Sequence, residues 1–331
     1  MVKTIQKLRK ILGTQGEPDP QLARLPLFIT GTMRSGTTLL VNKLSEHPQL
    51  FKIGDELNHI WTEIGGASCV GICEHKNENE ADNYYTYQMT NYFSQYIHKS
   101  KNTVRKLMRL YWYQKHNIGR INYDWDEIVP MNKSTHLMNK IGYVNGLFPG
   151  AKIILIIRDI YGQSSSQKFH FDEDFKKRQM YNFVPDDTMG CWTRRKIKNV
   201  DDLNTDKVYP GNFSVIPAMW LRLNSIALDK INELPEPQRL VISYEDLVQN
   251  QSAVLKKVFG FIGLNPGHEH EVEKICNQVM KFRNTTTAGN PLNKWKKLLS
   301  VNEIEQINTQ INENRDAYDK ILHALESVKE T

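Results

Sequence analysis

The residues with the clearest chemical potential form a short loop near the start of the chain. Gly31 and Gly36 bracket four residues, and Arg34 lies between them. The apolar run 27–30 before the loop is typical of a buried strand, and 37–46 after it has the apolar spacing of a helix. Backbone N–H groups in such a loop point inward, and the positive end of the helix dipole adds to them. The segment therefore predicts a site for a phosphate-like anion.

The two residues after the loop separate this site from one that hydrolyses nucleotides. A P-loop NTPase has a lysine that reaches the β- and γ-phosphates, followed by a hydroxyl that binds Mg²⁺. Here the pair is Thr37-Thr38, and Arg34 is the nearby cation. We expect a site without metal that holds a phosphate-like group. A P-loop kinase or NTPase is the alternative, for which Asp159 is the nearest residue to a Mg²⁺-binding aspartate after a strand.

A second anion site is predicted in the middle of the chain. The β-branched run 152–157 is typical of a strand buried in a parallel sheet, and it ends at Arg158. Ser166 follows eight residues later, about two turns into the next predicted helix, on a face that can turn back toward Arg158.

Other polar residues follow two further predicted strands, 50–54 and 128–132. Glu56 comes after the first, and Lys133 and His136 come after the second. Ligands of open α/β sheets bind at the carboxyl ends of the strands, so these residues are candidates for the same site. A helix-dipole role for Glu56 and a capping or packing role for His136 remain open.

The elements that position these residues alternate between strand and helix. Strands are predicted at 27–30, 50–54, 128–132, 152–157 and 239–243, with helical patterns between them. Such alternation predicts an α/β fold with right-handed crossovers. We expect three α/β/α layers around a central parallel sheet, with a P-loop-like loop and helical or irregular lid insertions.

The chain of 331 residues shows no linker that would divide it, so one domain is expected over 1–331. Residues 1–25 are predicted to form an N-terminal helix and a lead-in. The segments 65–125 and 170–212 are read as insertions that shape an acceptor pocket or lid, the second polar and irregular. The many aromatic residues of 65–125 could form either a core or the wall of that pocket.

Composition limits the classes of partner. A net charge of +6 suits an anionic cofactor but is too small to argue for nucleic acid. No apolar run is long enough to span a bilayer, so no stable membrane insertion is expected. The four cysteines have no paired metal-ligand spacing, which favours reduced thiols in a cytoplasmic protein.

Three stretches together resemble the PAPS-dependent sulfotransferase family. They are PLFITGTMRSGTTLL, PGAKIILIIRDIYGQSSSQ and RLVISYEDLV, and their order and separations resemble the family from about residue 26 to 300. The paired signature is specific: a loop with Arg-Ser-Gly-Thr-Thr, then a strand that ends in arginine with serine eight residues later. Within the family, the sequence most resembles the stand-alone small-molecule sulfotransferases. This resemblance implies PAPS as sulfonate donor, PAP as product and no metal.

The resemblance implies a nucleotide-binding role for each matching residue. The loop residues that match the site for the 5′-phosphosulfate of PAPS are Arg34, Ser35, Gly36, Thr37 and Thr38. Arg158 and Ser166 match the pair that holds the 3′-phosphate. Tyr244 resembles a tyrosine near the adenine. Lys294 and Lys296 flank a tryptophan in a segment similar to the one that returns to the 3′-phosphate, and which lysine makes the contact stays open.

The catalytic roles follow from what sulfonate transfer requires. The protein must align donor and acceptor, stabilise charge on the leaving phosphate and remove a proton from the acceptor. Arg34 or Lys133 can stabilise the charge. His136 resembles the histidine base of cytosolic enzymes, and Glu56 resembles the glutamate base of tyrosylprotein enzymes and ranks slightly ahead. The expected acceptor is a small molecule with a hydroxyl or amine; a cationic one would suit Glu56. The oligomeric state stays open.

Overall fold

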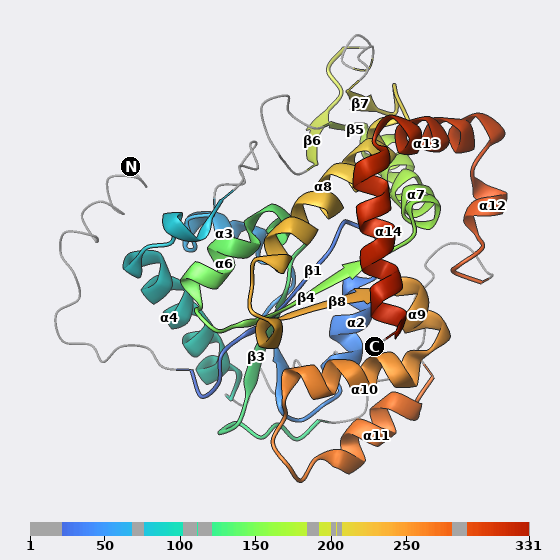
Figure 1. Ribbon diagram of the computed structural model, residues 1–331. Helices are drawn as coiled ribbons and strands as arrows, with labels where there is room; N and C mark the ends of the chain where they lie inside the picture. Colours follow the sequence, from blue (N-terminus) through green and yellow to red (C-terminus); the bar gives the residue numbers. More distant parts are fainter. Residues whose placement is uncertain are drawn as a thin grey trace, which may run out of the picture.

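The fold is seen in a computed structural model of the chain (Figure 1). The structure describes residues 22–67, 76–101, 111, 121–183, 192–199, 203, 207–279 and 290–330. The predicted N-terminal helix, up to residue 21, lies outside these residues. So do parts of the expected insertions 65–125 and 170–212.

The described residues contain a central parallel sheet with the strand order β2-β3-β1-β4-β8. Its strands are β1 (Leu27–Thr30), β2 (Leu50–Lys52), β3 (Val129–Lys133), β4 (Lys152–Ile157) and β8 (Arg239–Ser243). The sequence-based boundaries of β1, β4 and β8 are confirmed. β2 ends two residues earlier than expected, and β3 lies one residue later, so Lys133 closes the strand instead of following it.

Side chains of the sheet alternate between two apolar cores. On β1, Leu27 and Ile29 join one core and Phe28 joins the other. On β4, Ile154 and Ile156 lie on the same side as Leu27. This alternation is the two-residue period of a strand. Both faces are covered, and β4 accordingly has a continuous apolar run from Ile153 to Ile157, as expected of a parallel sheet.

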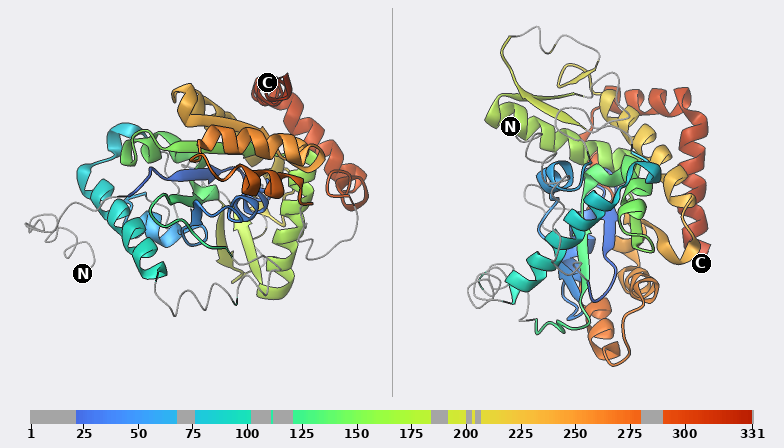
Figure 2. Two further views of the ribbon diagram at one scale, coloured as in Figure 1. Left: turned by 90° about the horizontal axis from the view of Figure 1, so that it is seen from below. Right: turned by 90° about the vertical axis from the view of Figure 1, so that its left-hand side faces the viewer.

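Helices cover each face, which confirms the predicted three-layer α/β/α architecture (Figures 1 and 2). The helices on the Leu27 side are α2 (Thr37–Leu44), α9 (Tyr244–Gln249), α10 (Gln251–Ile262) and α11 (Glu269–Asn277). The helices on the Phe28 side are α3 (Asn58–Glu63), α4 (Asn83–Ser100), α6 (Ile141–Leu147), α7 (Ile160–Arg178), α8 (Val215–Asn232), α13 (Val301–Glu313) and α14 (Arg315–Glu330). Shorter helical turns are η1 (Glu78–Glu80), η2 (Thr135–Lys140), η4 (Glu236–Gln238) and α12 (Trp295–Leu298).

The region 170–212 is more regular than the sequence suggested. Helix α7 runs on to Arg178, and β5 (Met180–Phe183) pairs antiparallel with β6 (Thr193–Lys196) and β7 (Val208–Tyr209) at the top of Figure 1. The basic residues here lie at the surface, and two of their arginines also pair with a buried carboxylate. Asp174 is almost fully buried and lies 2.8 Å from Arg194 and 3.0 Å from Arg178. This buried carboxylate ties the helix to the small sheet, a contact that charge counting along the sequence could not reveal.

The described aromatic residues of 65–125 act mainly as core. Met89 and Phe93 of α4 are fully buried, and the Phe93 ring stacks on Phe148 at 5.6 Å between centroids. Phe93 also lies 6.3 Å from Phe28 of the sheet. Helix α4 is therefore a covering helix whose aromatic face packs on the sheet.

Candidate functional site

The register of the sheet brings the ends of four strands to one edge. Ile29 of β1 pairs with Lys133 of β3, and Ile157 of β4 pairs with Ser243 of β8. The segments that follow these strands therefore meet at the carboxyl edge, where ligands of open α/β sheets bind. Glu56, Lys133, His136 and Arg158 were expected at this edge.

The loop 31–36 is shaped by close approaches that only glycine permits. A Cβ on Gly31 would lie 2.3 Å from the Ile156 carbonyl oxygen, and one on Gly36 would lie 2.4 Å from the Tyr244 ring. Gly36 also has a φ of 101°, a conformation that favours glycine. It precedes the first turn of α2, whose N–H groups have no partner within the helix. The loop thus has the backbone of an anion-binding cradle.

The two predicted anion sites are one cluster. Arg34 Nε donates to Ser166 Oγ at 3.1 Å, and Arg158 Nη1 donates to the Arg34 carbonyl oxygen at 3.1 Å. Burial and the nearby charge of Arg158 lower the pKa of the Arg34 guanidinium. Two cations held this close repel each other, and an anion between them would relieve that repulsion.

Several elements hold Arg158 in this position. Its guanidinium carbon lies 4.5 Å from the centre of the Tyr244 ring, and Nη2 donates to the Pro291 carbonyl oxygen at 3.1 Å. Trp220 Nε1 of α8 donates to the Arg158 carbonyl oxygen at 2.9 Å. Arg158 therefore joins the end of β4 to the start of α9 and to the segment before α12, bringing Tyr244 into the same cluster as Arg34 and Ser166.

The structure separates the two lysines of the 294–296 segment. Burial and the charge of Arg158 lower the pKa of Lys294. Lys296 is exposed, and its Nζ lies 5.6 Å from the centre of the Trp295 ring. The two lysines therefore differ in their surroundings, and the charge of Arg158 acts on Lys294.

Glu56 is held beside the end of β3. Asn132 of β3 donates to the carbonyl oxygens of Ile53 at 3.0 Å and Asp55 at 2.9 Å, which fixes the loop that carries Glu56. Lys133 Nζ then donates to Glu56 Oε1 at 2.5 Å. Buried hydrogen bonds donated by a side-chain amide fix the geometry of a loop, because their loss would leave backbone carbonyl oxygens unpaired.

The second carboxylate oxygen of Glu56 is engaged as well. Thr135 Oγ1 donates to Glu56 Oε2 at 2.9 Å. Burial alone would raise the pKa of Glu56, but the charge and hydrogen bond of Lys133 and the hydrogen bond from Thr135 outweigh it and leave this pKa below its usual value. Glu56 is therefore an ionised, paired carboxylate and a weak base.

The positive charge of Lys133 also acts on His136, where it favours the neutral form. It lies on η2, where its backbone N–H donates to Ser134 Oγ at 3.2 Å. Burial lowers the pKa of its imidazole; the Glu56 carboxylate opposes this, and the positive charges of Lys140 and Lys133 add to the lowering. The side chain is therefore a neutral imidazole at pH 7, which can accept a proton.

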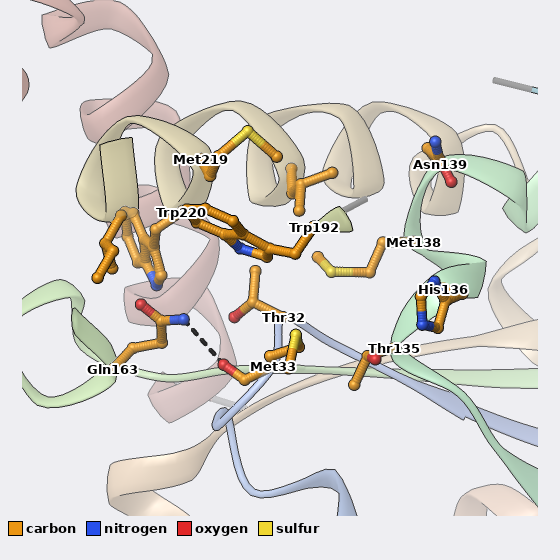
Figure 3. A pocket seen from close by; sticks show the side chains of 12 residues that line it. Thr32, Met33, Thr135, His136, Met138, Asn139, Gln163, Trp192, Met219 and Trp220 are labelled. Carbon is orange, nitrogen blue, oxygen red and sulfur yellow. Dashed lines mark hydrogen bonds between the residues drawn. The ribbon is translucent and has the colours of Figure 1, made fainter. Parts of the chain in front are cut away.

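A pocket opens beside His136 and the loop (Figure 3). It holds about 450 Å³ of empty space, its open mouth included. The lining residues are Thr32, Met33, Thr135, His136, Met138, Asn139, Gln163, Trp192, Ile216, Met219, Trp220 and Leu223. Most are apolar, and a few polar groups converge among them, as is usual for sites that bind small molecules. Glu56 and Lys133 are not part of the lining.

Most of this lining was not predicted. Ile216, Met219 and Trp220 come from α8, far along the chain from the loop. Among the lining residues that were not predicted, Gln163 could have been inferred from its spacing. It lies three residues before Ser166 on α7, so both share one helix face. The apolar period of α8 indicates a buried face but not what it covers.

The same edge is poorly suited to phosphoryl transfer. Asp159, the nearest candidate for a Mg²⁺-binding residue, caps α7 by accepting a hydrogen bond from the Gly162 N–H at 2.8 Å. Position 37 is threonine, so the P-loop lysine is missing. Among the described residues, no group of three or more His, Cys, Asp or Glu side chains could hold a metal ion. The described helices also include none that is both long and apolar enough to cross a bilayer.

No curated protein matches the sequence. A solved sulfotransferase domain from the curacin biosynthetic pathway is similar, with 18% identity and a TM-score of 0.41, over 87% of this chain and 98% of that one. A sulfotransferase from Alicyclobacillus acidocaldarius has 14% identity and a TM-score of 0.43, over 88% and 97%. Mouse sulfotransferase SULT7A1, solved with PAP, has 11% identity and a TM-score of 0.40, over 92% and 89%.

The match that decides the family is one of sequence. A description of the sulfotransferase family matches residues 26–268, which include the loop, Arg158 and Tyr244. This span is well over half of the 331 residues, and it does not favour the kinase or NTPase alternative. The chain belongs to the sulfotransferase family, whose reaction is the transfer of a sulfonate group.

Proposed function

We propose that this protein transfers a sulfonate from PAPS to a hydroxyl or amine of a small molecule. The observation that carries this proposal is the cluster of Arg34, Ser166, Arg158 and Tyr244 around the glycine loop. Two guanidinium groups beside a backbone cradle and a buried aromatic ring suit a nucleotide with two separate phosphates. A mononucleotide would leave one of the two cations without an anion.

The residues of the cluster fit this nucleotide. Ser35 Oγ and Arg158 Nε are buried and have no hydrogen-bond partner among the described residues. Buried polar groups rarely stay unpaired, so both are suited to meet a ligand. In this proposal Arg34, Ser35 and the N–H groups of 36–38, with Thr37 and Thr38, hold the 5′-phosphosulfate.

The 3′-phosphate end is assigned to the other half of the cluster. Arg158 and Ser166 bind the 3′-phosphate, and Lys294 adds a positive charge to it. Lys296 does not contact it, because its ammonium group lies over the ring of Trp295. Tyr244 offers its ring to the adenine, on the side where it already packs against Arg158.

PAPS supplies a sulfonate that is already activated, so the protein need not provide a metal. Lys133 stabilises the negative charge that grows on the leaving phosphate, together with Arg34 and the loop N–H groups. Lys133 lies at the end of β3 directly beside β1, which carries the loop. Its ion pair with Glu56 fixes the direction of the ammonium group.

His136 is the better candidate for the general base. It lines the pocket and is held neutral, whereas both oxygens of Glu56 are engaged by Lys133 and Thr135. A base must lie within hydrogen-bond reach of the proton it removes. The sequence placed Glu56 slightly ahead; we now propose that Glu56 orients Lys133 and that His136 takes the proton.

The described lining also bears on the acceptor. Apart from His136 it contains no ionisable side chain, and Glu56 is outside it. A cationic acceptor would find no carboxylate among these residues. We therefore propose a neutral, largely apolar acceptor in place of the cationic one that Glu56 alone would favour.

A thermal-shift comparison tests the nucleotide proposal. PAP should raise the melting temperature, because a ligand that binds only the folded state stabilises it. ATP with Mg²⁺ at the same concentration should have little effect, because the P-loop lysine is missing. Equal stabilisation by ATP and Mg²⁺ would contradict the proposal, and sulfonation of an acceptor screened by product mass would support it directly.

A further inference from the structure

We propose that Gln163 selects acceptors that carry a hydrogen-bond donor remote from the hydroxyl that receives the sulfonate. The acceptor is then a neutral, mostly apolar molecule with two polar ends. This inference rests on the proposed function, because it assumes that the pocket beside His136 holds the acceptor.

The orientation of the Gln163 amide is fixed by its neighbour. Nε2 donates to the Met33 carbonyl oxygen at 2.8 Å, and a carbonyl oxygen can only accept. The amide oxygen Oε1 must therefore point elsewhere. The side chain is 3% exposed, and Oε1 is buried without a hydrogen-bond partner among the described residues. An oxygen in this state can accept a hydrogen bond from a bound ligand.

Gln163 lies at the end of the pocket away from His136. In Figure 3, Gln163 and His136 lie on opposite sides of the pocket, with Thr32 and Met33 between them and Trp192 above. An acceptor that offers one hydroxyl to His136 would thus extend along an apolar slot toward Gln163. The walls favour a flat body, because methionine and tryptophan side chains contact ring faces well.

A second buried oxygen supports the same reading. Thr32 Oγ1 lines the pocket, is buried and has no hydrogen-bond partner among the described residues. A hydroxyl can donate as well as accept, so Thr32 can serve an oxygen on the ligand while Gln163 Oε1 takes the ligand's proton. A hydroxyl or N–H group on the acceptor would satisfy Gln163, whereas an ether or a carboxylate would not.

The expected selectivity follows from the cost of an unpaired buried acceptor. A ligand that lacks the hydrogen-bond donor but still excludes water from the pocket leaves Oε1 without a partner. This weakens binding by about 10- to 100-fold. Sites built to hydrogen-bond a substrate hydroxyl reject analogues without it more strongly than apolar pockets reject an extra methylene.

The test uses three matched probes with PAPS: 2,6-dihydroxynaphthalene, 6-methoxy-2-naphthol and 2-naphthol. All keep the ring and one hydroxyl, and only the first has a second donor. The smaller 2-naphthol controls for the bulk of the methoxy group. We expect kcat/KM for the diol to exceed that of both others by about 10- to 100-fold, after a factor of two for its equivalent hydroxyls. Calorimetry with the PAP-saturated protein gives the same ratio for binding alone.

Two variants on α7 separate selection from packing. Gln163→Met removes the oxygen with little change in volume and should bring all three probes within about threefold of one another. Gln167→Met is the matched control: Gln167 is also buried with an unpartnered Oε1, but it does not line the pocket. It should keep the full selectivity. Comparing probes on the same protein cancels any loss of donor binding.

Each outcome decides one question. Failure of PAP to bind would overturn the proposed function, and the inference with it. PAP binding without selectivity, without binding of any probe, or with selectivity unchanged in Gln163→Met would overturn the inference alone. That last result is expected if an ordered water satisfies Gln163.

Discussion

The anion cluster around Arg34 and Arg158 and the pocket around His136 share one edge of the sheet, but they are built differently. The cluster uses residues that directly follow strands or begin helices, such as Arg158 after β4 and Tyr244 at the start of α9. The pocket uses side chains from the middle of α8 and from Trp192 beside the small antiparallel sheet. The anion cluster is charged and relies on backbone geometry, whereas the pocket is mostly apolar and relies on side chains.

The difference shows how one fold can keep a cofactor and change its acceptor. The proposed nucleotide site depends on φ angles and close approaches, as at Gly36 against Tyr244, which few substitutions would preserve. The pocket depends on side-chain volume, which many apolar residues can supply. We therefore expect variants at the two ends to affect different kinetic constants.

The largest expected effect is at the base. His136→Asn should lower kcat by about 100- to 10,000-fold, the usual contribution of general base catalysis, while PAP affinity changes little. Because burial lowers the pKa of His136 from 6.5, and only the neutral form acts as base, kcat/KM should fall with decreasing pH only below 6.5. A kcat/KM pH profile checks this. The low-pH fall should disappear in His136→Asn, and a fall that persists in this variant would indicate Glu56 instead.

Lys133 should rank next. Lys133→Met should lower kcat by about 100- to 1,000-fold through lost stabilisation of the leaving phosphate, with nearly unchanged PAP affinity. It should also cost stability, because Glu56 keeps its charge without a partner. The double variant Lys133→Met with Glu56→Gln should recover stability in urea unfolding but not turnover. Unchanged turnover in either variant would favour a structural role for the pair.

A substitution of Arg158 tests the anion cluster. Arg158→Met should weaken PAP binding by about 10- to 100-fold, the scale of a charged hydrogen bond, and change 5′-AMP binding much less. Arg239→Met is the control, because Arg239 begins β8 at the opposite edge of the sheet. Isothermal titration gives both affinities. Equal losses for PAP and 5′-AMP would contradict a role at the 3′-phosphate.

The smallest effect concerns stability and separates acid unfolding from loss of catalysis. His47 is fully buried; burial and His268 lower its pKa to about 4, from 6.5. The lowered pKa means that its contribution to stability is complete above pH 6.5 and is lost as pH falls toward 4. His47→Asn should therefore flatten the fall in unfolding free energy between pH 7 and 4.5. A fall as steep as in the unmodified protein would show that other groups control it.

The residues of the anion cluster were easier to predict from the sequence than the residues of the pocket. The ends of β4 and β8 were predictable because β-branched runs stop at Arg158 and Tyr244. The sequence expected Ser166 to turn back toward Arg158, whereas its hydrogen bond comes from Arg34, a contact that the helix period did not predict. Likewise, nothing in the local pattern of α8 indicates that Trp220 faces the loop, because that contact depends on how distant helices pack.

The sequence also missed a contact of the basic residues in 170–212. Charge runs usually lie on solvated surfaces, but Asp174 on the preceding helix pairs with Arg194 and Arg178. The pairing depends on β5 and β6 folding back on α7, a tertiary event. The sequence also ranked Glu56 ahead of His136, because the contact of Lys133 with Glu56 crosses 77 residues.

The most direct test of the central claim is a crystal structure of the protein with PAP. The account predicts the 5′-phosphate against the N–H groups of 36–38 and the 3′-phosphate on Arg158 and Ser166, with the adenine beside Tyr244. A nucleotide bound away from Gly36 and Arg158, or with only one phosphate in contact with the protein, would contradict it.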